Sequence, residues 1–415
     1  MNYSVRDISL ADKGRLKIEW AEAHMPVLMK IRKIFESEKP FEGVNIGFAL
    51  HVTKETAVLV ETLIAGGGNV AIASCNPLST QDDVAAALAD NGVKVFAWRG
   101  ETRDEYYRNI NRVLDYKPNV TIDDGADLIF TIHKERRNLI KYIKGGCEET
   151  TTGIIRLRAM ERENKLEYPV MDVNDARTKH FFDNRYGTGQ STIDGILRAT
   201  NVLIAGKNFV ISGYGFCGKG VAKRAKGMGA NVIITEVDPV KALEAVMDGF
   251  RVMPMDRASE IGDIFVTVTG DVDIIRGRHI NKMKDGAIIA NSGHFNVEIN
   301  IREIEELSLR KKKIRENVEK HELKNGKSIY LLSEGRLVNL AAAEGHPSEV
   351  MDMSFANQAF AVRYIMENDL KPAIYKIPRE IDERIAKLKL KTMGIEIDKL
   401  TERQKKYLED WKEGT

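Results

Sequence analysis

Cysteine is scarce in this chain, which has only Cys75, Cys147 and Cys217 among its 415 residues. The three cysteines lie far apart and form no C-x-x-C motif, so neither a disulfide framework nor a structural zinc site is expected, and no metal is expected. Isolated cysteines in odd number are typical of a cytoplasmic protein with reduced thiols.

Long apolar runs and an excess of charge are also missing. Every apolar run is interrupted well before the roughly 18 residues that a transmembrane helix needs, and the N-terminal residues lack the pattern of a signal peptide. The net charge is only +2, so neither nucleic acid nor an acidic membrane is an expected partner. The remaining composition, 43% hydrophobic and 30% charged, is typical of a globular protein, and 415 residues predict two or three domains.

The clearest motif is G-x-G-x-x-G at Gly213, Gly215 and Gly218, which follows the apolar run 209–212 and opens a helical pattern. It predicts a tight turn, a close backbone approach to a pyrophosphate, and packing of the helix on the strand. The next strand pattern ends in Glu236, at about the 20-residue spacing of the acid that binds a ribose 2′-hydroxyl. Because an acid there would repel a 2′-phosphate, the motif favours NAD over NADP.

Strand and helix patterns alternate on both sides of this motif. The alternation predicts an α/β protein with two doubly wound parallel-sheet (Rossmann-like) domains and a small helical C-terminal tail. One long helix is expected over 11–37, and Lys311-Lys312-Lys313 is expected on a solvated helix face. The expected strands are 44–50, 70–74, 93–98, 120–122, 209–212, 231–235, 264–268, 287–290 and 329–332.

Polar residues follow two strands of the first half. His51 and Thr53 come after the strand 44–50, and Asp124 comes after the strand 120–122. One such residue is often only a helix cap or turn former. Because ligands bind beyond the carboxyl ends of parallel strands, several polar groups at equivalent ends indicate a site.

A second group of ionisable residues is the run 174–184. It is either a solvated charged face or part of a site. Phe181 and Phe182 favour a site, because we expect them to turn inward and bury Lys179 and Asp183 near one another.

Several of these stretches together resemble the S-adenosylhomocysteine hydrolase family. They are Leu-His-Val-Thr-Lys-Glu-Thr-Ala at 50–57, residues 148–153 and 174–187, the glycine motif, and Gly-His-Pro-Ser at 345–348. The resemblance implies a tightly held NAD and a nucleoside thioether substrate. It also implies oxidation of the ribose 3′-hydroxyl, removal of the 4′ proton, loss of homocysteine from C5′, addition of water and reduction of the ketone.

The resemblance also implies roles for individual residues. Lys179, with a pKa lowered by burial, is expected to take the 3′ proton. The catalytic residues are expected to be His51, Asp124, Glu149, Lys179, Asp183 and His294. Substrate binding is expected at Thr53, Glu55, Asp124, Glu149, Lys179, Asp183, Glu344, His346 and Met351. NAD binding is expected at Thr150, Thr151, Thr152, Asn184, Gly213, Gly215, Phe216, Cys217, Gly218, Glu236, Thr269, Ser292, Gly293, His294 and Asn339.

The resemblance implies a division of the chain and an assembly. Residues 1–176 with 346–378 are expected to form a discontinuous nucleoside domain, and 190–345 the NAD-binding domain. Residues 379–415 are expected to form a helical oligomerisation segment of a homotetramer, with one apolar face against another subunit.

The chain departs from the family pattern at three places. Thr188 stands where many members have cysteine, and the extended C-terminal tail that reaches a neighbouring NAD in many members is missing. Glu344 stands where animal members have methionine. An ionised Glu344 could accept a hydrogen bond from N1–H of a 6-oxo purine, which makes S-inosylhomocysteine an alternative to S-adenosylhomocysteine; otherwise Glu344 points to solvent or pairs with a Lys or Arg.

Two other functions fit part of the sequence. A 2-hydroxyacid dehydrogenase shares the two-domain architecture, but it does not explain Lys179, Asp183 or Glu149. A catalytically silent nucleotide-binding regulator would not need the candidate catalytic residues.

Overall fold

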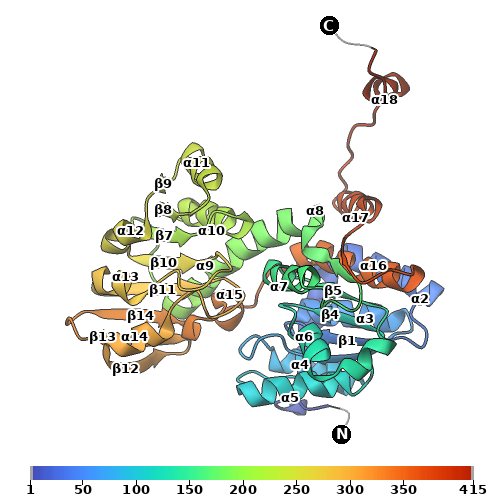
Figure 1. Cartoon of the computed structure of the whole chain (residues 1–415), viewed down its shortest axis with the longest axis horizontal. Coiled ribbons are helices and arrows are strands. Elements are labelled where there is room, and N and C mark those ends of the chain that lie inside the picture. The colour runs from blue at the N-terminus through green and yellow to red at the C-terminus, as the bar shows by residue number, and fades with distance from the viewer. Residues whose placement is uncertain (1–2, 413–415) are drawn as a thin grey trace.

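The structure is a computed structural model that describes residues 3–412 and consists of two lobes (Figure 1). The first lobe is built on a seven-stranded, entirely parallel sheet in the order β15-β6-β5-β4-β1-β2-β3. Its strands are β1 Asn45–Ala49, β2 Asn69–Ala73, β3 Lys94–Phe96, β4 Val120–Asp123, β5 Gly145–Glu148, β6 Val170–Asp172 and β15 Ile374–Lys376. The helices around it include α1 Ala11–His24, α2 Pro26–Glu38, α3 Lys54–Ala65, α4 Asp82–Asp90, α5 Arg103–Leu114, α6 Asp127–Glu135, α7 Thr151–Arg162 and α16 Ser348–Glu367.

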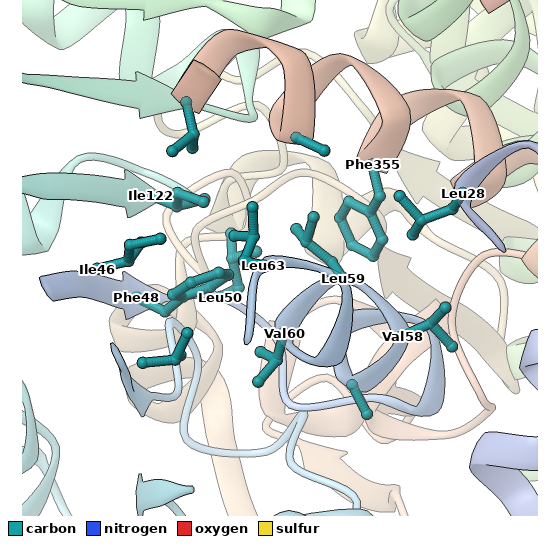
Figure 2. Close-up of a cluster of buried hydrophobic side chains, with 14 of the residues drawn as sticks. Leu28, Ile46, Phe48, Leu50, Val58, Leu59, Val60, Leu63, Ile122 and Phe355 are labelled. Atoms are coloured by element: carbon teal, nitrogen blue, oxygen red, sulfur yellow. The ribbon is translucent and has the colours of Figure 1, made fainter. Parts of the chain in front are cut away.

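The core of the first lobe fixes the strand ends that carry the candidate residues. Figure 2 shows Phe48 of β1 and Ile122 of β4 beside Leu59 and Leu63 of α3, with Phe355 of α16 close by. All five side chains are at most 3% exposed. Since burying one such side chain contributes about 1.5–3 kcal/mol, the end of β1 and the start of α3 are held firmly in place.

The second lobe has an eight-stranded mixed sheet in the order β12-β13-β14-β11-β10-β7-β8-β9. The strands from β14 to β9 are parallel, and β12, β13 and β14 are antiparallel. They are β7 Asn208–Ser212, β8 Asn231–Thr235, β9 Arg251–Val252, β10 Ile264–Thr267, β11 Ala287–Asn291, β12 Ser308–Arg315, β13 Val318–Leu323 and β14 Ser328–Leu332. Helices of this lobe include α9 Thr188–Thr200, α10 Phe216–Gly227, α11 Pro239–Met247, α12 Met255–Ile261, α13 Gly277–Lys282, α14 Ile301–Leu307 and α15 Val338–Ala341.

Two local expectations are wrong. The long helix over 11–37 is interrupted between α1 and α2, because Pro26 lacks a backbone N–H and occupies the first turn of a new helix. The lysines 311–313 lie in the edge strand β12, not in a helix. Asn317 adopts a positive φ of 61° in the turn that joins β12 to β13, and charged side chains are typical of an exposed sheet edge.

The chain crosses between the lobes twice. It leaves the first lobe through α8 Arg177–Lys179 and a π-helical segment, His180–Gly187, and returns through the loop 342–347, which leads into α16 of the first lobe. The C-terminal part then contains α17 Arg379–Thr392 and α18 Glu402–Glu409, which opens with a capping box at Thr401. Residues 413–415 of the expected oligomerisation segment lie outside the described residues.

The expectation that an apolar face of the segment 379–415 packs against another subunit is wrong for α17. Ile385 is fully buried, and Ile381 and Leu388 pack beside it against the core of the same chain's first lobe. This apolar face is therefore not available to another subunit. Beyond α17 the chain stands clear of both lobes (Figure 1).

No helix among residues 3–412 is long and apolar enough to cross a membrane.

Candidate active site

The candidate residues converge on one cavity of about 1030 Å³ lined by both lobes. All the residues expected above to act in catalysis, substrate binding or NAD binding line this cavity, except Gly218 and Glu344. The volume is at the upper end of the range of about 300–1,000 Å³ for ligand pockets, so a dinucleotide and a nucleoside could share it.

The glycine motif forms the dinucleotide end of the cavity. Gly213 follows β7 with a φ of +101°, a conformation that favours glycine. A Cβ at Gly215 would enter open space, and no side chain caps the N-terminus of α10 there, so its free amides can receive phosphates. A Cβ at Gly218 would lie 2.0 Å from the carbonyl oxygen of Gly213, which makes Gly218 a packing residue. Glu236, directly after β8, lines the cavity as the ribose-binding acid should.

Lys179 and Asp183 are buried side by side, as the sequence predicts. Their ammonium and carboxylate groups are 3.1 Å apart, and Lys179 also donates to the side-chain oxygens of Asn174 at 3.1 Å and Asn184 at 2.9 Å. The expectation that Phe181 and Phe182 both turn inward and bury this pair is only partly right, because Phe182 is 38% exposed. The other oxygen of Asp183 is hydrogen-bonded to Nδ1 of His346.

The pKa of Lys179 differs from the expectation. Burial lowers the pKa of this lysine, but the carboxylates of Asp183 and Glu149 raise it more, and the net shift is upward. The pKa of Asp183 is raised by burial and lowered more strongly by His346 and Lys179, so its net shift is downward. Both groups are therefore charged at neutral pH, and the prediction of a lowered lysine pKa is wrong.

Glu149 is held by polar side chains of α16. Ser354 Oγ donates to one of its carboxylate oxygens at 2.5 Å, and Gln358 Nε2 donates to the other at 2.6 Å. The ammonium of Lys179 lies 3.5 Å from this carboxylate. Burial raises the pKa of Glu149 more than Lys179 lowers it, so the carboxyl group binds a proton more readily than an ordinary glutamate.

A further polar group, His51, Asp124 and His294, brings side chains of the two lobes together. Asp124, after β4, lies 3.4 Å from Nε2 of His51 and 3.4 Å from Nδ1 of His294, which follows β11. Ser79 Oγ lies 2.7 Å from the other ring nitrogen of His51. A Cβ at Gly125 would lie 2.3 Å from His294, so a glycine is needed for this close approach. Burial lowers the pKa of His51 to about 4 despite the nearby Asp124, which leaves its imidazole neutral.

Glu344 does not reach the cavity. Its carboxylate binds Lys54 Nζ at 3.0 Å and Arg198 at 3.2 Å, and its side chain is 50% exposed. The expectation that Glu344 pairs with a Lys or Arg is confirmed. Lys54 also lies 3.2 Å from Glu55, and Ser348 Oγ donates to the same Glu55 oxygen at 2.7 Å.

Several supporting residues were missed. One oxygen of the buried Glu148 accepts the backbone N–H groups of Gly125 at 2.8 Å and Thr150 at 3.0 Å, which ties the Asp124 loop to the start of α7. Glu298 similarly holds the backbone of Thr269. The sequence could have pointed to Ser348, Ser354 and Gln358, because they are polar residues on the face of α16 that also carries its buried apolar residues.

The comparisons with known proteins agree with this geometry. Residues 184–345 match the family model "S-adenosyl-L-homocysteine hydrolase, NAD binding domain", and residues 2–141 match the model "S-adenosyl-L-homocysteine hydrolase". The chain is 65% identical over 415 residues to the S-inosyl-L-homocysteine hydrolase of Methanocaldococcus jannaschii, with all of both chains covered. It is 61% identical over 417 residues to the adenosylhomocysteinase of Sulfolobus acidocaldarius and 60% identical over 418 residues to that of Aquifex aeolicus, again with full coverage.

A more distant likeness concerns the fold alone. The dipicolinate synthase chain solved from Bacillus halodurans superposes with a TM-score of 0.50 at 12% identity, covering 79% of this chain and 100% of that one. Full-length identities near 60% carry far more weight. The chain belongs to the S-adenosyl-L-homocysteine hydrolase family, as an enzyme with NAD as its cofactor.

Proposed function

We propose that this enzyme cleaves the thioether bond of a nucleoside–homocysteine substrate reversibly, through a 3′-keto nucleoside. One observation carries the proposal: the Lys179–Asp183–His346 group and the His51–Asp124–His294 group line the same cavity as the dinucleotide-binding glycines. When bound, NAD supplies a reversible oxidation at C3′ of the ribose. A dehydrogenase of 2-hydroxy acids would have no use for the buried Lys179, Asp183 and Glu149.

Lys179, Asp183 and Glu149 are proposed to hold the ribose hydroxyls. Because Lys179 is cationic here, we assign it hydrogen bonding to the 3′ oxygen and stabilisation of the negative charge that develops as the hydroxyl is oxidised. Asp183, fixed by His346, and Glu149, fixed by α16, keep the ammonium in position.

His51 and Asp124 are proposed to perform the proton transfers at C4′ and C5′. A 3′ ketone makes the 4′ hydrogen acidic, and a neutral His51 beside Asp124 forms an acid–base pair that can remove it. The same pair then protonates the leaving sulfur and activates the incoming water. His294 reaches this pair from the second lobe.

The lobes are proposed to be the two domains. Residues 1–176 and 346–378 form the nucleoside domain, and 190–345 form the NAD-binding domain. The parallel pairing of β15 with β6 and the packing of α16 on the first lobe support this division.

The purine subsite is proposed to lie at Glu55, where Lys54 and Ser348 contact Oε1 and the other carboxylate oxygen would accept a hydrogen bond from the base. A hydrogen-bond acceptor there suits the 6-amino group of adenine and also N1–H of hypoxanthine. S-adenosylhomocysteine is the first candidate substrate, and the M. jannaschii relative, named for the inosyl compound, favours S-inosylhomocysteine as the second.

A comparison of the two thioethers tests this assignment. Glu344 is paired at the surface, so Glu344→Met should change the ratio of their kcat/KM values by no more than a few-fold. Glu55→Gln should instead lower kcat/KM for both thioethers, because weakening a buried hydrogen bond to the base can cost up to about 10⁴-fold. A large change in the ratio with Glu344→Met, and unchanged kcat/KM values with Glu55→Gln, would contradict the assignment.

The assembly is proposed to be a homotetramer that uses the segment after α17. Its support is a run of exposed apolar side chains that stands clear of both lobes, namely Met393, Ile395, Ile397, Leu400, Tyr407, Leu408 and Trp411. The mass of the chain in solution, with and without residues 393–415, tests this. A cytoplasmic location stays a prediction.

A further inference from the structure

The helical segment that carries Lys179 begins without a capping side chain of its own. α8 starts at Arg177 and is preceded by Ala176, whose methyl group cannot accept hydrogen bonds from the first backbone N–H groups of the helix. α8 runs on into the π-helical segment and α9, so its first turn sets the position of Lys179 and Asp183. Because Thr178 is buried, its backbone N–H needs an acceptor from elsewhere in the fold.

Asp382, in the first turn of α17, supplies this acceptor. One of its carboxylate oxygens accepts the backbone N–H of Arg177 at 2.9 Å. The other accepts the backbone N–H of Thr178 at 2.9 Å and also the Thr178 hydroxyl. The carboxylate is buried, and a negative charge is favourable at the N-terminus of a helix. Asp382 therefore caps a helix that begins 205 residues earlier in the chain.

Further contacts hold the first turn of α8 and the helix α17 in place. Asn357 of α16 donates to the Thr178 hydroxyl at 2.8 Å, so this hydroxyl is hydrogen-bonded on both sides. Lys389, seven residues after Asp382 on α17, donates to the fully buried Asp352 of α16 at 2.9 Å. The start of α8 is thus fixed against two helices of the C-terminal part of the chain.

We propose that Asp382 is a positioning residue that fixes the ammonium of Lys179 for the oxidation at C3′, an inference that rests on the proposed function. Lys179 directly follows the two backbone N–H groups that Asp382 accepts, and its ammonium lies 3.1 Å from Asp183, four residues further on. Asp382 contacts α8 and acts on the reaction only through Lys179. A displacement of about 1 Å in a catalytic group can cost about 100-fold in rate, so loss of the cap should slow the oxidation.

Asp382→Asn tests the proposal, because it keeps the size of the side chain but leaves one acceptor oxygen in place of two. The kcat for thiol release and the rate of reduced-nicotinamide formation on rapid mixing should both fall about 10–100-fold. KM should change little and NAD should be retained, because Glu55 and the glycine motif are unaltered. A cap that serves stability alone would lower Tm but leave both rates unchanged for each NAD-loaded chain, and this result overturns the proposal.

A double variant separates this inference from the proposed function. If Asp382 acts through Lys179, Asp382→Asn should slow the reaction no further when Lys179→Met is already present, since coupled residues have non-additive effects. Effects that multiply independently would overturn the inference. Near-native activity of Asp382→Asn beside an impaired Lys179→Met overturns the inference alone, whereas near-native activity of Lys179→Met contradicts the proposed function as well.

Two further variants complete the test. Thr178→Val removes the hydroxyl that joins Asp382 to Asn357 and serves if Asp382→Asn does not fold. It should slow the formation of reduced nicotinamide several-fold, and an unchanged rate would overturn the proposal. The matched control is Glu383→Gln, at the next residue of α17, which pairs with Arg379 at 2.7 Å and is partly exposed. It should behave like the wild type, and an effect as large as that of Asp382→Asn would count against a specific role for Asp382.

Discussion

Lys179→Met is expected to reduce thiol release by at least about 10²–10³-fold, the loss typical of removing a group that stabilises developing charge. Asp183→Asn should have a similar effect, because its carboxylate holds both the ammonium of Lys179 and the ring of His346. Both residues lie outside the glycine motif, so both variants should retain NAD. The measurements are thiol release from either thioether and the nicotinamide content of the purified variants.

A matched control for this prediction is Lys165→Met. Lys165 pairs with Glu163 at the surface, with 69% of its side chain exposed, and its loss should leave activity unchanged. Near-native thiol release in either Lys179→Met or Asp183→Asn would show that the ribose-binding role is wrongly assigned. Loss of NAD together with activity would place these residues in cofactor binding.

The second large effect is expected in the proton-transfer step. His51→Asn and Asp124→Asn should slow elimination by about 10²–10⁴-fold, the usual contribution of general acid–base catalysis. Oxidation at C3′ precedes this step and uses other residues, so reduced nicotinamide should accumulate in these variants. Rapid mixing with substrate, followed by the absorbance of the reduced nicotinamide, measures this accumulation. If neither variant forms reduced nicotinamide, His51 and Asp124 act in the oxidation or in binding instead.

The parts of the site that depend on local sequence could be predicted. The turn at Gly213, the packing role of Gly218 and the position of Glu236 follow from spacing within one strand–turn–helix unit. The convergence of His51 and Asp124 also follows, since both come at the carboxyl ends of neighbouring parallel strands.

Contacts between distant segments could not be predicted in the same way. The pKa of Lys179 depends on Glu149 as well as on burial, and the orientation of Glu149 depends on α16, about 200 residues further along the chain. Burial alone predicted a lowered lysine pKa, and only the three-dimensional arrangement of the carboxylates shows that the pKa is raised. The pairing of Glu344 with Lys54 is likewise a contact between remote segments.

The strands of the fold likewise divide into those that the sequence predicted and those that it missed. Parallel strands of the first lobe were recognisable because buried strands are apolar runs, yet β5 was missed because its sequence, Gly-Gly-Cys-Glu, contains little of the β-branched character of a strand. The β12–β13 hairpin was missed because its first strand is exposed along almost its whole length and carries three consecutive lysines.

Hydrolysis in D₂O, without added nicotinamide, tests the central claim most directly. If the enzyme acts through a 3′-keto nucleoside and removal of the 4′ proton, the nucleoside released with homocysteine carries deuterium at C4′. Mass spectrometry of the product measures this. Release of thiol and nucleoside with the original hydrogen retained at C4′ would show direct displacement at C5′ and contradict the account.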